Sequence, residues 1–235
     1  MNSQFTAEES RIKRIYSTRD TSNKPALYAW HREEVLLNAY RLRSVAAALL
    51  SGNHMKDMAG ITALDVGCGS GGWLRTLVDW GASPENLHGI DLLGDRIEKA
   101  KISAPGIDFR IASGFELPYA EQTMALVSAH TVFSSILDGS ARKTLAREMA
   151  RVLIPTGAVF IYDYRVSHPR NKDTTGIRRP EIQRLFPGFF LQIRSLTLAP
   201  PVARRIAPVS PLLAHFLEKV FPFLRTHAIY FLKWA

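Results

Sequence analysis

The chain has 235 residues, and its 46% hydrophobic and 22% charged content is typical of a folded globular protein rather than a disordered one. Its single cysteine, Cys68, excludes an internal disulfide and is consistent with a reducing compartment. The first twenty residues lack the apolar run of a secretory signal, and no stretch reaches the roughly 18 apolar residues of a spanning helix. We therefore expect a cytoplasmic protein. The net charge is +9, and residues 177–235 hold nine Lys or Arg against two Glu.

The N-terminal quarter reads as a helical cap. Residues 1–24 form a polar arm for which we expect partial mobility. Residues 25–51 are rich in helix formers, with apolar positions three or four apart, which predicts one long or two shorter amphipathic helices. We assign residues 1–58 to this arm and cap.

From residue 62 onward, short apolar runs alternate with helical stretches. This alternation predicts parallel strands joined by right-handed crossovers. The expected strands are 62–66, 87–91, 107–112, 125–130, 158–162, 189–198 and 227–233. The expected helices are 72–80, 95–101, 140–153, 181–186 and 211–220, the last begun by Ser210 as cap and Pro211. The predicted fold is an α/β, doubly wound, mostly parallel seven-stranded sheet with helices on both faces, over residues 59–235, with a helical insertion at about 200–224.

A glycine-rich loop follows the first strand in the stretch ALDVGCGSGG, residues 63–72. Gly67, Gly69 and Gly72 match the dinucleotide pattern G-x-G-x-x-G, and Asp91 lies near the expected 20 residues further on. Such a loop brings backbone amides close to a ligand. Asp65, however, would repel a pyrophosphate and suits a ligand that carries an ammonium and a sulfonium.

Four ordered motifs resemble those of the class I methyltransferases that use S-adenosylmethionine (SAM). They are LDVGCGSG at 64–71, GIDL at 89–92, LPY at 117–119 and RVLIPTG at 151–157. The resemblance implies SAM as cofactor and S-adenosylhomocysteine as product. It implies cofactor contacts from Asp65, Gly67, Cys68, Gly69, Gly71, Asp91, Leu92, Gly114 and His130. Where the family commonly has an Asp that binds the adenine amine, this chain has Ser113, whose hydroxyl is an alternative acceptor, and Phe115 is placed to pack on the adenine.

Ligands in such a sheet lie at the carboxyl ends of the strands, which directs attention to the ends of the fourth and fifth strands. His130 is the first candidate for a base, because neutral imidazole accepts a proton near pH 7; a purely structural histidine is the alternative. Asp163 and His168 are further catalytic candidates, with ordinary loop hydrogen bonds as the alternative. Substrate contacts are expected from Tyr28, Trp30, Tyr164 and Arg165. The dispersed histidines indicate no metal site.

The substrate is less constrained than the cofactor. The basic C-terminal quarter favours a phosphate-bearing substrate, and the whole chain loosely resembles methyltransferases of polysaccharide biosynthesis, so we predict O-methylation of a sugar hydroxyl in a surface glycan or its nucleotide-linked precursor. The alternatives are a natural-product O- or N-methyltransferase, an NAD(P)-binding oxidoreductase and a non-catalytic SAM-binding scaffold. An apolar helix expected beside arginines near residues 200–225 suggests peripheral contact with a membrane or a lipid-linked substrate. Nucleic acid is not an expected partner, and the sequence indicates no oligomeric state.

Overall fold

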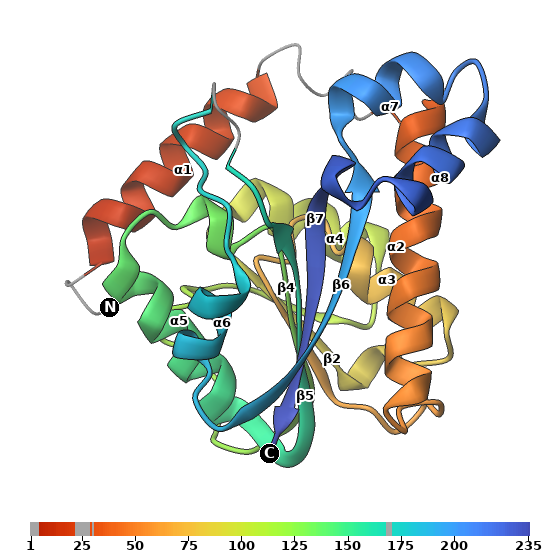
Figure 1. Cartoon of the computed structure of the whole chain (residues 1–235). Coiled ribbons are helices and arrows are strands. Elements are labelled where there is room, and N and C mark those ends of the chain that lie inside the picture. Colours follow the sequence, from red (N-terminus) through yellow and green to blue (C-terminus); the bar gives the residue numbers. More distant parts are fainter. Residues whose placement is uncertain (1–4, 22–28, 30, 168–170) are drawn as a thin grey trace.

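The structure is a computed structural model, and it describes residues 5–21, 29, 31–167 and 171–235 (Figure 1). Seven strands form one sheet in the order β3-β2-β1-β4-β5-β7-β6. β7 is antiparallel to both of its neighbours, and the other pairings are parallel. The strands are β1 Ala63–Val66, β2 Leu87–Asp91, β3 Asp108–Ile111, β4 Met124–His130, β5 Leu153–Tyr164, β6 Phe189–Leu198 and β7 Arg225–Trp234.

Helices cover both faces of the sheet, as the alternating pattern predicts (Figure 1). The helices are α1 Thr6–Thr21, α2 Glu33–Gly52, α3 Gly72–Asp79, α4 Gly94–Ser103, α5 Gly139–Val152, α6 Arg179–Leu185, α7 Pro200–Ile206 and α8 Pro211–Val220. Short 3-10 turns lie at η3 Pro84–Asn86, η4 Phe133–Ser135 and η5 Pro222–Leu224. The predicted doubly wound, mostly parallel seven-stranded sheet is confirmed.

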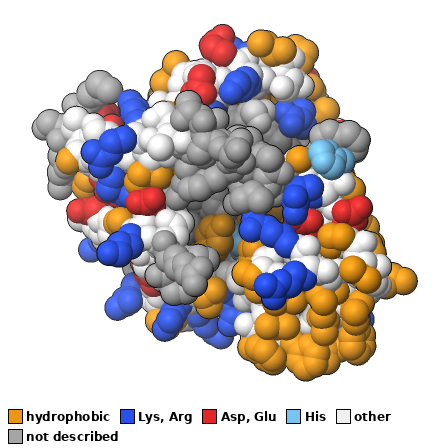
Figure 2. Space-filling model, turned by 90° about the horizontal axis from the view of Figure 1, so that it is seen from above, with side chains coloured by type: hydrophobic (Ala, Val, Ile, Leu, Met, Phe, Trp, Pro, Cys, Tyr) orange, Lys and Arg blue, Asp and Glu red, His pale blue; other side chains and the backbone are white. Residues whose placement is uncertain are grey.

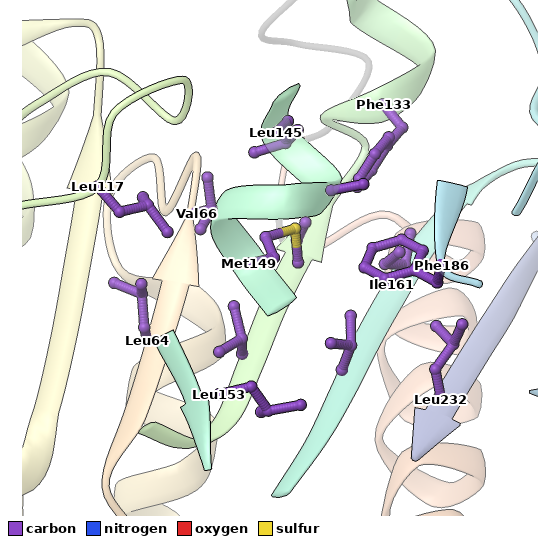
Figure 3. Close-up of a cluster of buried hydrophobic side chains, with 14 of the residues drawn as sticks. Leu64, Val66, Leu117, Phe133, Leu145, Met149, Leu153, Ile161, Phe186 and Leu232 are labelled. Atoms are coloured by element: carbon purple, nitrogen blue, oxygen red, sulfur yellow. The ribbon is translucent and has the colours of Figure 1, made fainter. Parts of the chain in front are cut away.

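Strand periodicity divides the core between the two faces. Leu64 and Val66 of β1 point into a cluster with Leu145 and Met149 of α5 (Figure 3). Ala63 belongs to the opposite cluster, which contains apolar side chains of α2, α3 and α4. Alternate residues of one strand thus serve different layers, as pleated geometry requires. The central strands are buried on both faces, and their functional surface is left at the strand ends.

The N-terminal region contains two described helices, α1 and α2. The expected mobile arm of residues 1–24 contains helix α1, most of whose side chains are polar or charged. Within the predicted helical stretch 25–51, the described helix begins at Glu33. The division of the chain at residues 58 and 59 stays a prediction.

The insertion between β6 and β7 contains α7, α8 and η5. The side chain of Ser210 accepts a hydrogen bond from the Leu213 amide at 3.2 Å, which confirms the predicted cap of α8. A small separate cluster, centred on Leu198, Ala203 and Ala214, packs the insertion against the rest of the chain. The insertion therefore packs on β6 and α2 through small buried side chains and larger, partly buried aliphatic ones.

Candidate active site

A cavity of about 510 Å³ lies at the carboxyl ends of β1, β2 and β4, a volume within the usual range for small-molecule sites. Its walls come from several regions of the chain, including α1 and α2. Of the residues predicted to bind cofactor, the cavity lining includes Asp65, Gly67, Cys68, Gly69, Asp91, Leu92, Gly114, Phe115 and His130. Residues not predicted to bind cofactor also line it, among them Ile12, Tyr16, Leu42, Arg43, Trp73, Arg96 and Ser135.

The glycine loop turns sharply under the cavity. Gly67 has φ +71°, and a Cβ there would lie 2.6 Å from Cγ2 of Val132, so only glycine fits. Gly71 has φ +79°, and a Cβ there would lie 2.8 Å from the Phe109 ring, on the side of the loop that packs against β3. Gly71 is therefore required by packing, and it is not among the residues that line the cavity.

The loop amides bind within the protein, whereas the sequence led us to expect them to face a ligand. The amides of Gly67 and Cys68 both donate to the carbonyl of Ile90, at 2.8 and 2.9 Å. The Gly69 amide donates to Oδ2 of Asp91 at 3.0 Å. These bonds join the loop to the end of β2, and their effect is to place the Asp91 carboxylate at the cavity wall.

Asp91 is held firmly in that position. Its other oxygen, Oδ1, accepts from the Leu93 amide at 2.9 Å, and the residue is 8% exposed. Each carboxylate oxygen can accept a second hydrogen bond. A neighbouring pair of ligand hydroxyls, such as those of a ribose, matches this arrangement.

Asp65 is the second acid of the cavity and is almost completely buried. Burial raises the pKa of its carboxyl to about 7, although the Ser128 hydroxyl, which donates to Oδ1 at 2.8 Å, opposes the shift. The nearby Asp91 charge raises the pKa further. A cationic ligand would relieve the cost of ionising Asp65, so the residue suits an ammonium or sulfonium group.

His130 lies among rings at the end of β4. Its ring centroid is 4.8 Å from that of Trp73, 5.6 Å from Phe160 and 6.0 Å from Tyr162. Burial lowers the pKa of His130 to about 3, so the imidazole is neutral near pH 7. Its Nε2 atom and the indole Nε1 of Trp73 are both buried without a hydrogen-bond partner among the described residues. Both rings line the cavity, while the two nitrogens themselves are shielded from solvent.

The Ser113 hydroxyl is occupied by the protein itself. It donates to the Glu9 carboxylate of α1 and accepts from the Phe115 amide at 3.1 Å. Ser113 does not line the cavity, whereas Gly114 and Phe115 do. The Phe115 ring packs on Phe5, with centroids 4.9 Å apart. Phe115 is therefore the residue of this segment that is positioned to contact a flat ligand ring.

The other predicted site residues lie away from the cavity lining or outside the described residues. The two Asp163 oxygens accept from the amides of Ser134 and Tyr164 at 3.1 and 2.8 Å, and burial raises its pKa to about 6. The ring of Tyr164 packs on that of His227, with centroids 4.0 Å apart, and the guanidinium of Arg165 donates to the carbonyl of Pro222 at 3.2 Å. These contacts give each a structural role. Tyr28, Trp30 and His168 lie outside the described residues.

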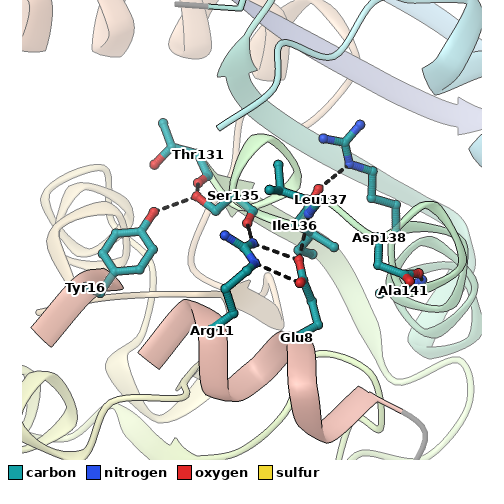
Figure 4. A network of polar contacts seen from close by, with 10 residues as sticks. Glu8, Arg11, Tyr16, Thr131, Ser135, Ile136, Leu137, Asp138 and Ala141 are labelled. Atoms are coloured by element: carbon teal, nitrogen blue, oxygen red, sulfur yellow. Dashed lines mark hydrogen bonds and ion pairs between the residues drawn. The ribbon is translucent and has the colours of Figure 1, made fainter. Parts of the chain in front are cut away.

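Helix α1 crosses the cavity and contributes Ile12 and Tyr16 to it. Polar contacts fasten the helix to residues 131–138 (Figure 4). Glu8 accepts from the Leu137 amide at 2.6 Å, and Arg11 donates to both the Glu8 carboxylate and the Ser135 carbonyl. The Tyr16 and Ser135 hydroxyls share a hydrogen bond of 2.6 Å. The Glu8–Arg11 spacing is the one signal of this attachment in the sequence, since the partners lie more than a hundred residues away.

Neither a metal site nor a membrane span is found in the part of the chain that the structure describes. No three His, Cys, Asp or Glu side chains gather among the described residues into a potential metal site. None of the helices described is both long and apolar enough to cross a bilayer.

Comparisons with known proteins agree with this geometry. A family model described as a methyltransferase domain matches residues 63–157. A demethylmenaquinone methyltransferase of Bacillus licheniformis is 31% identical over 103 residues, 43% of this chain and 43% of that protein. A ubiquinone biosynthesis O-methyltransferase of Xanthomonas oryzae is 32% identical over 131 residues, 53% of this chain and 49% of that protein. The chain thus spans about half the length of the curated relatives it matches.

Solved structures extend the likeness to nearly the whole chain. A geranyl diphosphate C-methyltransferase from Streptomyces coelicolor, solved with Mg²⁺, geranyl diphosphate and S-adenosylhomocysteine, has a TM-score of 0.66 and covers 98% of this chain and 99% of its own, at 16% identity. A structure from Galdieria sulphuraria, provisionally named a sarcosine dimethylglycine methyltransferase, has a TM-score of 0.61 at 17% identity. The match covers 82% of this chain and 85% of that one. Residues 63–157 therefore resemble a methyltransferase domain, and the chain has the fold of the class I SAM-dependent methyltransferases.

Proposed function

We propose that this chain is a SAM-dependent methyltransferase that binds SAM in the cavity at the carboxyl edge of the sheet. The observation that carries the proposal is the placement of two buried acids, Asp65 and Asp91, on one cavity wall beneath the glycine turn. The methyltransferase-domain match over residues 63–157 supports it independently.

The residues present fit the cofactor at each end. Asp91 is placed to accept hydrogen bonds from the ribose hydroxyls, and Phe115 to pack on the adenine. Asp65 balances the positive charge of the methionine part. When bound, SAM supplies a methyl group that its positive sulfur has already activated. The protein must then align an acceptor atom with this methyl and exclude water.

We assign to Trp73 and His130, which both line the cavity, the role of holding an acceptor hydroxyl. The indole Nε1 carries a hydrogen and can donate to the hydroxyl oxygen, while a neutral imidazole can accept the hydroxyl proton at an unprotonated Nε2. The low pKa of His130 keeps it unprotonated throughout the physiological range. This pairing favours O-methylation over N-methylation, and the proton-acceptor role of His130 remains the prediction made from the sequence, for which a bound acceptor must raise the low pKa of the imidazole.

The acceptor is a small molecule, and two classes have support. The sequence favours a sugar hydroxyl of a nucleotide-linked or lipid-linked glycan precursor, because the C-terminal quarter is basic. One relative is named a demethylmenaquinone methyltransferase and the other a ubiquinone biosynthesis O-methyltransferase, and the second name supports the hydroxyl of a quinone precursor as acceptor. Of the aromatic rings near His130, Trp73 lines the cavity, and its flat face suits either acceptor.

Transfer of labelled methyl distinguishes these classes. The purified chain is incubated with methyl-labelled SAM and separate fractions of a cell extract: nucleotide sugars, polysaccharide, and organic-solvent-soluble lipids. Label in sugar-containing material supports the glycan acceptor, and label in aromatic lipid supports the quinone class. Label in none of the three fractions, although SAM binds, would contradict both acceptor classes and favour a non-catalytic SAM-binding scaffold.

A further inference from the structure

The α7–α8 insertion exposes an unusual amount of apolar surface. On α8, Leu212 is 82% exposed and Phe216 56%, and they lie four residues apart on the same side of the helix. Phe223 of η5 is 78% exposed. We call the following side chains the insertion face: Val209, Leu212, Leu213, Phe216, Val220, Phe221 and Phe223. Figure 2 shows a continuous apolar surface with basic side chains beside it.

The insertion face is not the side by which the insertion is anchored. Ala203, Ala207 and Ala214 make that contact, together with Leu198 at the end of β6. The buried Glu218 lies on this inner side too, where its Oε1 accepts from the Thr197 amide at 3.3 Å. A helix of a soluble protein normally presents polar residues on its outer side. α8 is apolar on both sides, so its outer side needs an occupant.

The charges around the insertion face identify the kind of occupant. Residues 199–224 contain three basic side chains, Arg204, Arg205 and Lys219, of which Arg205 and Lys219 are exposed. The only acid in this range is Glu218, which is completely buried. Within this range an apolar surface is bordered by cations and carries no exposed acid, which matches the boundary of an anionic bilayer, where phosphates meet acyl chains.

A second copy of the chain fits this surface less well. Most homodimers are two-fold symmetric, and a two-fold contact places the same surface on both sides. Such a contact would bring Arg204, Arg205 and Lys219 of both copies to one interface, to which residues 199–224 contribute no exposed acid. We propose that the insertion face docks onto an anionic lipid bilayer.

Sheet topology places this surface at the same edge as the cavity. The insertion enters β7 at Arg225, and β7 is antiparallel to β5, with Tyr164 opposite His227. The start of β7 therefore lies at the carboxyl end of β5, beside the end of β4 that holds His130. Arg165 joins the loop after β5 to the insertion by donating to the carbonyls of Pro222 and Arg225. Docking would bring the cavity edge close to the membrane. If the proposed function holds, on which this step rests, the methyl acceptor is itself bound to the membrane.

Vesicle sedimentation of the full chain tests the docking without cofactor or acceptor. We expect binding to vesicles of mixed phosphatidylglycerol and phosphatidylcholine, weaker binding to phosphatidylcholine alone, and a loss with rising salt. The double variant Leu212→Ser, Phe216→Ser should bind at least about tenfold more weakly. The double variant Arg204→Glu, Arg205→Glu leaves the apolar side chains in place and should also lose about tenfold or more.

The matched control is Ile102→Ser on α4, since Ile102 is 83% exposed but lies outside the insertion. It should bind as the unmodified chain does, and circular dichroism checks that every variant folds. Three results would overturn the proposal: no binding of the unmodified chain to anionic vesicles, equal binding by both double variants, or self-association in ultracentrifugation that Leu212→Ser, Phe216→Ser abolishes while vesicle binding stays absent.

Discussion

The rings of Trp73 and His130 lie 4.8 Å apart, and each presents a buried nitrogen without a hydrogen-bond partner among the described residues. If His130 accepts the acceptor's proton, His130→Ala should lower turnover by roughly a hundredfold with SAM affinity retained. Turnover with labelled SAM and binding calorimetry measure the two quantities. Tyr162→Phe is the control, because it keeps the ring and removes only a hydroxyl bound to Thr197 at 2.7 Å. Unchanged turnover in His130→Ala would remove this role.

Trp73→Phe tests the other half of the pair. The substitution keeps an aromatic ring against Phe160 and removes the Nε1 donor. We expect KM for the acceptor to rise or kcat to fall by about tenfold, the usual effect of one lost hydrogen bond in a buried site. Trp80→Phe, at the end of the same helix, should have no such effect. Equal kinetics for both variants would show that the indole nitrogen makes no contact with the acceptor.

The raised pKa of Asp65 predicts a pH dependence of SAM binding. Its carboxyl has a pKa of about 7 instead of its usual 3.8, so below pH 7 the folded protein without ligand holds a proton that SAM must displace. Affinity should therefore fall by up to about tenfold for each pH unit below 7 and level off above it. Calorimetry across this range should show a flatter dependence for Asp65→Asn than for the unmodified chain.

The matched control for Asp65→Asn is Asp163→Asn. Burial raises the Asp163 pKa to about 6, but its carboxylate lies outside the cavity lining, so the variant should keep the Asp65-dependent slope of SAM affinity against pH.

The raised pKa of Asp65 also affects the stability of the protein without ligand. Because the unfolded state releases the Asp65 proton at lower pH, stability should decline as pH rises from about 4 to 7. A SAM affinity of the unmodified chain that does not change with pH would contradict the role of an ionised Asp65 in binding.

Helix α1 should stabilise bound cofactor through its contacts with residues 131–138. The double variant Glu8→Ala, Arg11→Ala removes the hydrogen bonds to the Leu137 amide and the Ser135 carbonyl. We expect SAM affinity to fall about tenfold, and amide exchange in α1 to accelerate. Arg14→Ala, an exposed change on the same helix, is the control. Faster amide exchange in α1 with unchanged SAM affinity would show that α1 does not contribute to cofactor binding.

The local sequence predicts the sheet and the acids of the cavity because their signals are local. Apolar runs of strand length mark the parallel sheet, and the glycines around 67–71 mark the turn that joins β1 to Asp91. Two expectations at the same turn differ from the structure: Gly71 packs against Phe109, and the loop amides bind Ile90. Both depend on how closely β2 and β3 approach, which the sequence of the loop does not contain.

The parts that sequence inspection missed depend on distant contacts. The Ser113 hydroxyl binds Glu9, which is 104 residues away, so its availability for adenine could not be judged from its own neighbours. α1 reads as a polar arm because most of its side chains are polar or charged, yet paired polar contacts hold it across the cavity. Trp73 resembles an ordinary core residue of an amphipathic helix, and only the cavity reveals its unpaired nitrogen.

Titration calorimetry with SAM tests the central claim most directly. We predict binding at one site by the unmodified chain, at least about tenfold weaker binding by Asp91→Asn, and no effect of Glu98→Gln, an exposed acid on α4. NADH should give no heat. Binding of NADH with no response to SAM, or full SAM affinity in Asp91→Asn, would contradict the account.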